Sequence, residues 1–591
     1  MTYASYSLKI WTGCANKRRC EMVTIVTELD DLDQLFGKKL PREPAALDEL
    51  LYSVKCELSG TAQTQTTSIP DDAEVQLENK DTNRPDTWSA EGIARALRGY
   101  ENIEVGIKRY SARAHVVDIN VDKQLAEIRP FICCSVVKRV TMNDTIIRGL
   151  IQLQEKLDQT YGRNRRRSSI GFYDFDLIRP PLRYGVAGLD EVRFVPLEGT
   201  QPLSLREILD QHPKGIEYGQ IVRHFDKMPI LLDSREKVLS FPPIINSNDL
   251  GRLTPETKNI LIEITGTSEK TVSSALTILT TCLADRGGEI YSAKIHYPYG
   301  NRRTVTTPDL SEHFVKVSLT DIRNLIGLTL SRHNIIKLLR RARFDVKNGS
   351  AARLTVRVPC YRLDIMHPVD VIEDIAIAHG LNHFKPRWPP DITVGGISPM
   401  EAFSDKVREL MVGLGFQEVL AFMLSNPEKQ YAKMNRPLGR PVEISNPKLT
   451  TMTCLRSWLL PSLMEFLSNN THVAYPQELF EVGDYVDWDD SFPTKARDMR
   501  SLACVSAHSK ANFTDMKSNL EPLMMNLGFT FTVGPVEHPS FLPGRVGSIH
   551  INDEQVGIIG EVHPQVIENW KVQNPVAAME LELDKLFKMQ S

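Results

Sequence analysis

The 591-residue sequence has no run of 18 apolar residues, so we expect no membrane-spanning helix. Its nine cysteines are scattered without a Cys-x-x-Cys pair, which fits a reducing cytosol and predicts no zinc site. Neither a P-loop nor a Rossmann glycine pattern is present. The formal net charge is only −3, so any contact with nucleic acid should be local. With 41% hydrophobic residues, a chain of this length should form several globular domains.

The most informative segment, residues 361–380, combines a helix signature with acidic side chains. Pro368 suits the first helical position, and Gly380 suits the left-handed residue that ends a helix. Three acids spaced at i, i+3 and i+4 share one helix face, and a fourth precedes the helix. The four acids are Asp364, Asp370, Glu373 and Asp374. Converging carboxylates repel each other unless a cation or an arginine neutralises them, and oxygen ligands favour Mg²⁺. The simpler alternative is that these acids complement the helix dipole.

This segment resembles the signature of the β subunit of phenylalanyl-tRNA synthetase, in its archaeal and eukaryotic cytosolic form. The matching residues run from Arg362-x-Asp364-Ile365 through His367-Pro368-x-Asp370 to Glu373-Asp374 and Gly380. The resemblance extends over residues 22–591. It implies that the four acids bind Mg²⁺ near an α subunit that carries ATP, phenylalanine and the ligation chemistry. It also implies a cytoplasmic (αβ)₂ heterotetramer that acts on tRNA(Phe), with no membrane attachment.

We predict an α+β multidomain chain of five segments. Residues 1–21 are an extension of unknown role, and residues 22–100 form an N-terminal module and junction. Residues 101–298 form a tRNA-editing-like domain, and residues 299–386 a small helical, winged-helix-like, metal-binding module. Residues 387–591 form a class II synthetase-like antiparallel sheet domain without catalytic motifs.

Local patterns also predict individual helices. Ser89 can cap a helix that Gly99 ends, and apolar residues recur at helical spacing over 146–157. Two helical runs between 319 and 341 join near Gly327, and a further helix covers 400–412.

The last segment resembles a class II synthetase catalytic module at residues 443–447, 455–463 and 479–484. An active module of this class needs an arginine–glutamate pair on its ATP-binding hairpin and a second arginine for the γ-phosphate. Arg456 could mimic the first arginine. The final strand, residues 577–583, has neither an arginine nor a glycine-rich approach. Because these clamps supply the main electrostatic stabilisation of adenylate formation, we expect no ligation on this chain.

The editing-like domain carries four strings that resemble the family's editing module, in the same order. They are residues 170–176, 212–218, 240–246 and 263–267, the last reading Glu-Ile-Thr-Gly-Thr. The predicted pocket residues are Tyr173, Asp174, Pro242, Pro243, Asn246, Thr265 and Gly266. The simpler interpretation of Asp174 is a turn cap.

A physical argument explains why editing is needed. Tyrosine differs from phenylalanine by one hydroxyl, and an apolar pocket rejects an added hydroxyl by only ~10²-fold. A second site that hydrogen-bonds the hydroxyl can exclude phenylalanine by ~10⁴–10⁵-fold. No Ser-His-Asp or Cys-His arrangement is visible in the sequence of this domain, so we expect hydrolysis by a positioned water.

A basic cluster follows the helix at 146–157. It consists of Arg163, Arg165, Arg166 and Arg167. Such a run is usually a solvated loop, but it is also a candidate contact for tRNA phosphates. Two other functions remain open: a free-standing editing hydrolase and a non-catalytic RNA-binding scaffold. Only the β-subunit interpretation demands a stoichiometric second subunit.

Overall fold

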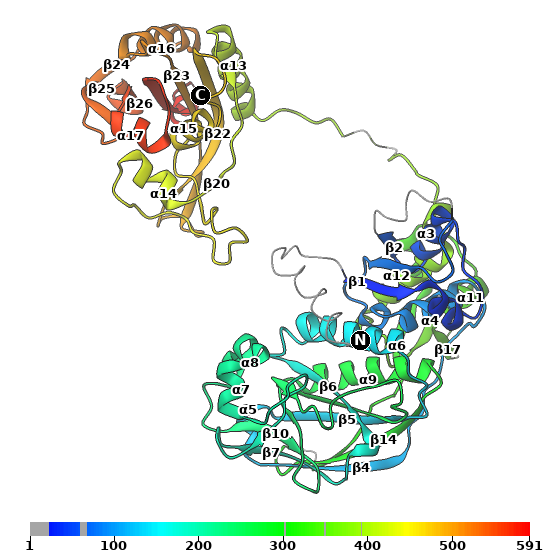
Figure 1. Cartoon of the computed structure of the whole chain (residues 1–591). Helices are drawn as coiled ribbons and strands as arrows, with labels where there is room; N and C mark the ends of the chain where they lie inside the picture. Colours follow the sequence, from blue (N-terminus) through cyan, green and yellow to red (C-terminus); the bar gives the residue numbers. More distant parts are fainter. Residues whose placement is uncertain are drawn as a thin grey trace. The chain divides into compact units, whose positions relative to one another are not determined.

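The computed structural model describes residues 23–59, 68–300, 303–347, 350, 352–389, 391 and 393–590. The predicted extension at residues 1–21 therefore lies outside the described residues. The chain forms two compact units, Met1–Arg387 and Trp388–Ser591 (Figure 1). The fold is a mixed α/β multidomain arrangement, as the sequence predicts at this level. Within the described part, no helix is both long and apolar enough to cross a membrane.

A ten-stranded mixed sheet organises the editing-like domain. Its strand order is β12-β11-β10-β7-β4-β14-β5-β13-β6, with β15 paired to β14. Strand β4 pairs in parallel with β7 and β14, and the other pairs are antiparallel. The strands are β4 Arg113–Val121, β5 Phe131–Lys138, β6 Ser168–Asp174, β7 Leu182–Ala187, β10 Met228–Leu232, β11 Val238–Phe241, β12 Ile245–Asn246, β13 Ile260–Gly266, β14 Glu289–His296 and β15 Thr304–Thr307.

Two long helices cover one face of this sheet, α6 (Asp144–Lys156) and α9 (Glu269–Asp285). Alternate residues of β13, including Ile260, Ile262 and Ile264, pack against them. The opposite face of β13 therefore carries Glu263 and Thr265, because successive side chains of a strand point to opposite sides. Smaller helices α7 (Leu205–Gln211) and α8 (Pro213–Tyr218) pack beside β10 and β11 in a separate apolar cluster.

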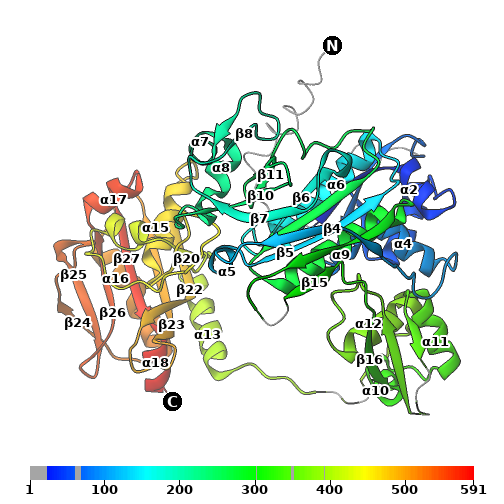
Figure 2. The same ribbon diagram turned by 90° about the horizontal axis from the view of Figure 1, so that it is seen from below.

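The N-terminal module and the module near residue 350 share one apolar core. Figure 2 shows three helices of the later module gathered around strand β16. One cluster of buried residues includes Leu77 and Leu97 from the first module, and Leu339, Val356 and Ile375 from the second. The first module contains β1 Val23–Glu28, β2 Cys56–Ser59, β3 Glu74–Asn79, α2 Leu29–Phe36, α3 Pro44–Tyr52 and α4 Ala90–Tyr100. The second contains β16 His313–Ser318, β17 Asp345–Lys347, β18 Arg353–Val358, α10 Leu319–Ile326, α11 Arg332–Arg341 and α12 Pro368–His379.

The second unit is built on a seven-stranded sheet of order β19-β22-β23-β27-β26-β25-β24. It is antiparallel except for the β19–β22 pair. Helices cover both faces, because separate apolar clusters join α13, α16 and α18 to one face and α15 and α17 to the other. The strands are β19 Gln417–Glu418, β22 Gln477–Trp488, β23 Ala496–Ala507, β24 Thr532–Pro535, β25 Phe541–Ile551, β26 Glu554–Val562 and β27 Val576–Glu582. The helices are α13 Pro399–Gly413, α15 Leu460–Asn469, α16 Phe513–Leu527, α17 Pro564–Trp570 and α18 Leu583–Gln590.

Most of the predicted local helix signals are confirmed, but Gly99 does not end its helix, because α4 continues through Gly99 to Tyr100. The Ser89 side chain accepts a hydrogen bond from Gly92 N at the start of α4. Pro368 occupies the first turn of α12, and Gly380 follows its last residue with φ +96°. Gly327, at φ +75°, separates α10 from α11. The helix predicted over 400–412 is α13, which extends one residue further at each end.

Candidate functional site

A pocket of about 290 Å³ lies in the editing-like domain, and the predicted string 240–246 forms one wall of it. We call this segment, Ser240–Asn246, the pocket wall. It contributes the predicted residues Pro242, Pro243 and Asn246. Strand β6, helix α6 and the start of α8 also contribute to the lining, with Ser169, Gln154 and Lys214. A ring-sized group can therefore enter between the wall and the sheet.

Glu263 lines this pocket and is the most unusual group in it. Its side chain projects from β13 and is only 2% exposed, and burial raises the pKa of the Glu263 carboxyl to about 7. The hydroxyl of Tyr173, on the neighbouring strand β6, donates to Glu263 Oε2 at 2.9 Å and to Asn246 Oδ1 at 3.3 Å. Within the described residues, Glu263 Oε1 and Ser240 Oγ are buried without a hydrogen-bond partner. The pocket thus offers an unused polar pair to a ligand.

Gly171 makes this arrangement possible. It lies opposite Glu263 in the β6–β13 register. A Cβ atom at position 171 would lie 2.4 Å from the Tyr173 hydroxyl and 2.8 Å from Glu263 Oε2. Any larger residue would push the two polar groups apart, so the glycine belongs to the site although it carries no functional group.

Four of the predicted pocket residues do not line this pocket, namely Tyr173, Asp174, Thr265 and Gly266. Tyr173 acts only from behind the lining, through its contacts with Glu263 and Asn246. The Asp174 carboxylate accepts from Asp176 N at 3.0 Å and from Thr257 Oγ1 at 3.0 Å, so it caps a turn. Thr265 Oγ1 accepts from Arg129 Nε at 3.0 Å. Gly266 backs onto the chain at Arg167, whose carbonyl oxygen would lie 2.1 Å from an added Cβ atom.

Glu263 and His212 line the pocket but were not assigned to it from the sequence. Both stand inside the strings that carried the family resemblance. The available signal for Glu263 was its position as the one charged residue of a largely apolar strand, Ile260–Gly266. For His212 there was no comparable signal, because His-Pro also starts helices, and its Nδ1 does accept from Lys214 N at 3.2 Å.

The basic cluster divides into two kinds of side chain. Arg163, Arg166 and Arg167 are exposed, as a contact with RNA phosphates requires. Arg165 differs, because its side chain is only 15% exposed and lies 3.3 Å from Asp158. It also lines the pocket. The four arginines therefore do not form one uniform surface.

The four acids of the segment 361–380 each have a protein partner. Arg362 donates to Asp364 Oδ1 at 2.9 Å and to Asp374 Oδ2 at 2.6 Å. Burial opposes ionisation of Asp364, but Arg362 outweighs it and holds the pKa of Asp364 at about 2. Glu373 pairs with Lys55 Nζ at 2.6 Å.

Asp370 accepts from the backbone N–H groups of Met366 and His367, at 2.8 and 2.7 Å, and so caps α12. Among the described residues, no group of three or more acids, histidines or cysteines is placed to hold a metal ion. As placed, the four carboxylates do not form an oxygen cage that fits Mg²⁺. An arginine neutralises the buried pair, which is the alternative that the sequence left open.

In the second unit, Arg456 is not available to bind a triphosphate. It is 1% exposed, its Nη2 lies 2.8 Å from Glu481 Oε1, and its Nε donates to the carbonyl oxygen of Asp484 at 2.8 Å. Strand β27 ends at Glu582 and leads directly into α18 without an arginine. The cationic group of Arg456 is therefore committed to pairing within this unit.

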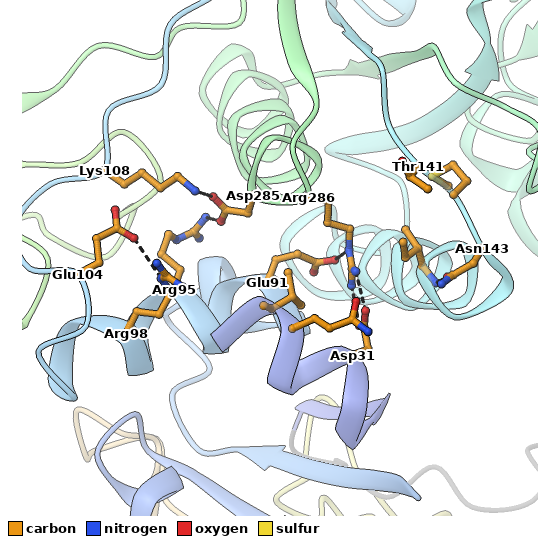
Figure 3. Close-up of a pocket in the computed structure, with 14 residues that line it drawn as sticks. Asp31, Glu91, Arg95, Arg98, Glu104, Lys108, Thr141, Asn143, Asp285 and Arg286 are labelled. Carbon is orange, nitrogen blue, oxygen red and sulfur yellow. Dashed lines mark hydrogen bonds and ion pairs between the residues drawn. The ribbon is translucent and has the colours of Figure 1, made fainter. Parts of the chain in front are cut away.

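Figure 3 shows a second pocket, of about 470 Å³, where α4 meets the end of α9. Charged side chains line it in opposite pairs. Asp285 lies 2.7 Å from both Arg95 and Lys108, while Arg286 pairs with Asp31 at 2.8 Å and with Glu91. Because the cations and acids neutralise each other, these pairs join the N-terminal module to the editing-like domain rather than form a ligand site.

Comparison with known proteins identifies the class. Residues 315–381 match the model of the tRNA synthetase B5 domain, and residues 386–583 match that of the phenylalanyl-tRNA synthetase beta chain CLM domain. A crystal structure of an N-terminal fragment of the phenylalanyl-tRNA synthetase β subunit from Pyrococcus horikoshii covers 60% of this chain and 99% of the fragment. Its identity is 38% and its TM-score 0.57. The matched domains and the fold are those of a tRNA synthetase subunit.

Similarity to full-length relatives identifies the family within this class of tRNA synthetase subunits. The phenylalanine–tRNA ligase β subunit of Pyrococcus furiosus is 43% identical, over 94% of this chain and 98% of the relative. Those of Thermococcus kodakarensis and Methanothrix thermoacetophila are 42% and 39% identical, covering 94% and 85% of this chain and 98% and 91% of each relative. The chain belongs to the family of phenylalanine–tRNA ligase β subunits.

Proposed function

We propose that this chain supports the ATP-dependent attachment of phenylalanine to tRNA(Phe) and also edits the product. In this proposal an α subunit binds ATP and performs ligation, within a cytoplasmic (αβ)₂ heterotetramer. The editing-like domain of this chain hydrolyses tyrosyl-tRNA(Phe). The observation that carries the editing proposal is the buried Glu263 carboxyl in a pocket of about 290 Å³, with one oxygen that has no hydrogen-bond partner among the described residues.

Support for the α partner comes from an exposed apolar edge before β20 (Leu424–Ser425) in the second unit. Leu420, Phe422 and Leu424 alternate with less exposed residues and are 87%, 77% and 41% exposed. An extended segment with this period presents its apolar side chains on one side, and such patches mark protein interfaces. We assign this edge to the α subunit, because the family pairs the two chains and Arg456 has no ligation role.

Tyrosine and phenylalanine would be distinguished at Glu263. The tyrosine hydroxyl can donate to Glu263 Oε1 or accept from Ser240, the two groups without partners in the described residues. Bound phenylalanine would exclude water from the same two groups without forming hydrogen bonds to them. Leaving a buried polar group unpaired costs about 1–3 kcal/mol per group, and more for a charged one. The pocket therefore favours the tyrosyl group, which editing hydrolyses, over the phenylalanyl group.

Hydrolysis adds water across the ester that joins tyrosine to the terminal ribose. The water oxygen bonds to the carbonyl carbon, the bond to the ribose oxygen breaks, and a proton passes to that ribose oxygen. Burial lowers the pKa of His212, so its ring is neutral near pH 7. Because His212 Nδ1 accepts from Lys214 N, its Nε2 carries the proton and can donate to the developing oxyanion.

Deacylation of preformed tyrosyl-tRNA(Phe) by the complex of this chain with its α subunit tests the proposal. We expect Glu263→Ala to slow hydrolysis by about 10- to 100-fold, the value of a hydrogen bond to a charged group. Glu269→Gln is the matched control, because Glu269 is an exposed acid on the adjoining helix α9. Equal rates in wild type and Glu263→Ala would exclude this pocket as the editing site.

The two alternatives differ in composition. Co-purification from the native cell should recover a stoichiometric α subunit with this chain. Recovery of the chain alone with deacylase activity would instead favour a free-standing hydrolase. Recovery of the chain with RNA but without deacylase activity would favour a non-catalytic scaffold.

A further inference from the structure

The basic turn, residues 163–167, has an unusual backbone. It follows a π-helical turn, Leu157–Tyr161, that extends α6. Three successive residues then have left-handed φ angles, namely Arg163 at +50°, Asn164 at +51° and Arg165 at +63°. Residues with side chains rarely adopt this region even singly, so a run of three must be held by its surroundings. Strained segments of this kind cluster at ligand clamps and switches.

Backbone hydrogen bonds hold the basic turn in this form. Arg165 N donates to Asp158 O at 3.0 Å, and Arg167 N donates to Gly162 O at 2.8 Å. On its other side, Thr267 N donates to Arg167 O at 3.0 Å. The turn is thus fixed between the end of α6 and the end of β13.

The left-handed run sends Arg165 inward while its neighbours face solvent. Arg165 Nη1 donates to the carbonyl oxygens of Pro243 at 3.2 Å and Ile244 at 2.9 Å, both in the pocket wall. Its Nε lies 3.3 Å from Asp158 Oδ2, and its guanidinium group stacks on the Tyr218 ring at 4.4 Å. The Arg165 side chain is therefore clamped from three directions.

The pocket wall has to be placed accurately because Asn246, at its end, accepts the hydrogen bond from Tyr173 that also organises Glu263. Apart from two residues of β11 and the two of β12, the wall is a loop. Arg165 contacts this loop by donating hydrogen bonds to the carbonyl oxygens of Pro243 and Ile244. A displacement of a positioning group by about 1 Å can cost ~10²-fold in rate.

We propose that Arg165 is a positioning residue that sets the pocket wall, and that the basic turn joins RNA contact to pocket geometry. The exposed arginines 163, 166 and 167 contact the tRNA backbone, and Arg165, in the same strained turn, holds the wall against the bound aminoacyl group. This inference rests on the proposed editing function. It differs from the expectation that all four arginines contact phosphates.

The experiment measures deacylation of tyrosyl-tRNA(Phe) by the complex with the α subunit, separating kcat from KM at several salt concentrations. Arg165→Met removes the clamp, and Arg165→Lys retains the charge but loses the two-carbonyl contact. Arg163→Met is the matched control, because residue 163 has the same left-handed backbone but an exposed side chain. Amide hydrogen exchange of residues 240–246 gives a readout that does not depend on activity.

We expect Arg165→Met and Arg165→Lys to lower kcat at least tenfold, with KM changed less than twofold and faster exchange in the pocket wall. Arg163→Met should raise KM and reduce its dependence on salt, while kcat and exchange stay at wild-type values. The inference is overturned if Arg165→Met behaves like Arg163→Met, or if exchange in 240–246 is unchanged. Failure of the wild-type complex to deacylate tyrosyl-tRNA would instead contradict the proposed function, and the exchange data would still test the clamp.

Discussion

Glu263 shows how one residue can be unfavourable for folding and useful for recognition. Its carboxyl is buried and keeps one oxygen without a hydrogen bond in the described structure. A buried group of this kind costs stability unless it is paired. Strongly shifted acids of this type in a pocket are typical of functional sites. The proposed substrate hydroxyl would supply the missing partner.

The raised pKa of Glu263 predicts a pH dependence of stability. Because burial raises this pKa from 4.5 to about 7, the folded state keeps a proton that the unfolded chain has lost between these values. Stability from this group is therefore complete below about pH 4.5 and declines as the pH rises to 7, by about 3 kcal/mol at most. Glu263→Gln removes this titration.

The measurement is the thermal midpoint of Glu263→Gln relative to wild type. We expect the thermal midpoint of Glu263→Gln to rise relative to that of wild type between pH 5 and pH 7.5. Using this difference cancels the contribution of Glu580, whose pKa burial also raises to about 7. Parallel profiles for the two proteins would show that Glu263 does not titrate in this range.

For the acidic segment, residues 361–380, an experiment can decide whether an arginine or a Mg²⁺ ion neutralises the carboxylates. If Arg362 neutralises Asp364 and Asp374, the thermal midpoint should be indifferent to Mg²⁺ in the millimolar range. Asp370→Ala should then cost about 0.5–2 kcal/mol, as loss of a helix cap does, equally with and without Mg²⁺. If Mg²⁺ stabilises wild type or promotes its assembly with the α subunit, and this effect is absent in Asp370→Ala, the predicted metal site exists.

The sequence placed Pro242, Pro243 and Asn246 at the candidate site but not its internal contacts. The strings containing these residues were found by their resemblance to the family, and the same resemblance placed Asp174 in the pocket. Asp174 instead caps a turn through Asp176 N and Thr257. The inward direction of Arg165 depends on three left-handed residues, which no pattern of arginines reveals.

At the scale of single elements, helix ends were predictable where the sequence signal lies within a few residues of the end. Caps and stops at Ser89, Pro368, Gly327 and Gly380 define helices within a few residues, because they satisfy the unpaired backbone groups at helix ends. The order of strands in the ten-stranded sheet was not predictable in the same way. It depends on pairs such as β14 with β4, which are distant in the sequence.

The exposed edge at residues 420–424 gives a prediction about an element. Leu420→Ser combined with Phe422→Ser should weaken association with the α subunit at least tenfold, because two large apolar side chains lose their buried surface. Stability of the chain alone should change by less than 0.5 kcal/mol, the usual size for exposed positions. Size-exclusion chromatography of the mixed subunits gives the readout.

Met525→Ser is the control for this experiment, because Met525 is 73% exposed on α16 of the same unit and lies outside the edge. It should leave association unchanged. If the edge variant assembles as well as the control, the α subunit docks elsewhere.

At the scale of the whole molecule, one core is built from two distant parts of the chain. The sequence suggested separate modules at 22–100 and 299–386, whereas the structure buries both in one apolar cluster. Gly99 illustrates how closely the two parts approach each other. A Cβ atom at this position would lie 2.3 Å from the carbonyl oxygen of Arg341. The editing-like domain is thus inserted between two halves of one folding unit, and charged pairs around Asp285 and Arg286 attach it to that unit. Contacts across more than 200 residues leave no periodic trace in the sequence.

Division of labour between two chains gives the last prediction, on ligation. The purified chain alone should show no phenylalanine-dependent exchange of pyrophosphate into ATP. The reason is electrostatic: Arg456 is buried and pairs with Glu481 and Asp484, and β27 supplies no second arginine for the γ-phosphate. Adding the α subunit should restore exchange, which provides the positive control. Exchange that persists after the α subunit is shown to be absent would mean that the second unit retains a working catalytic site, and that Arg456 must leave its partners to bind ATP.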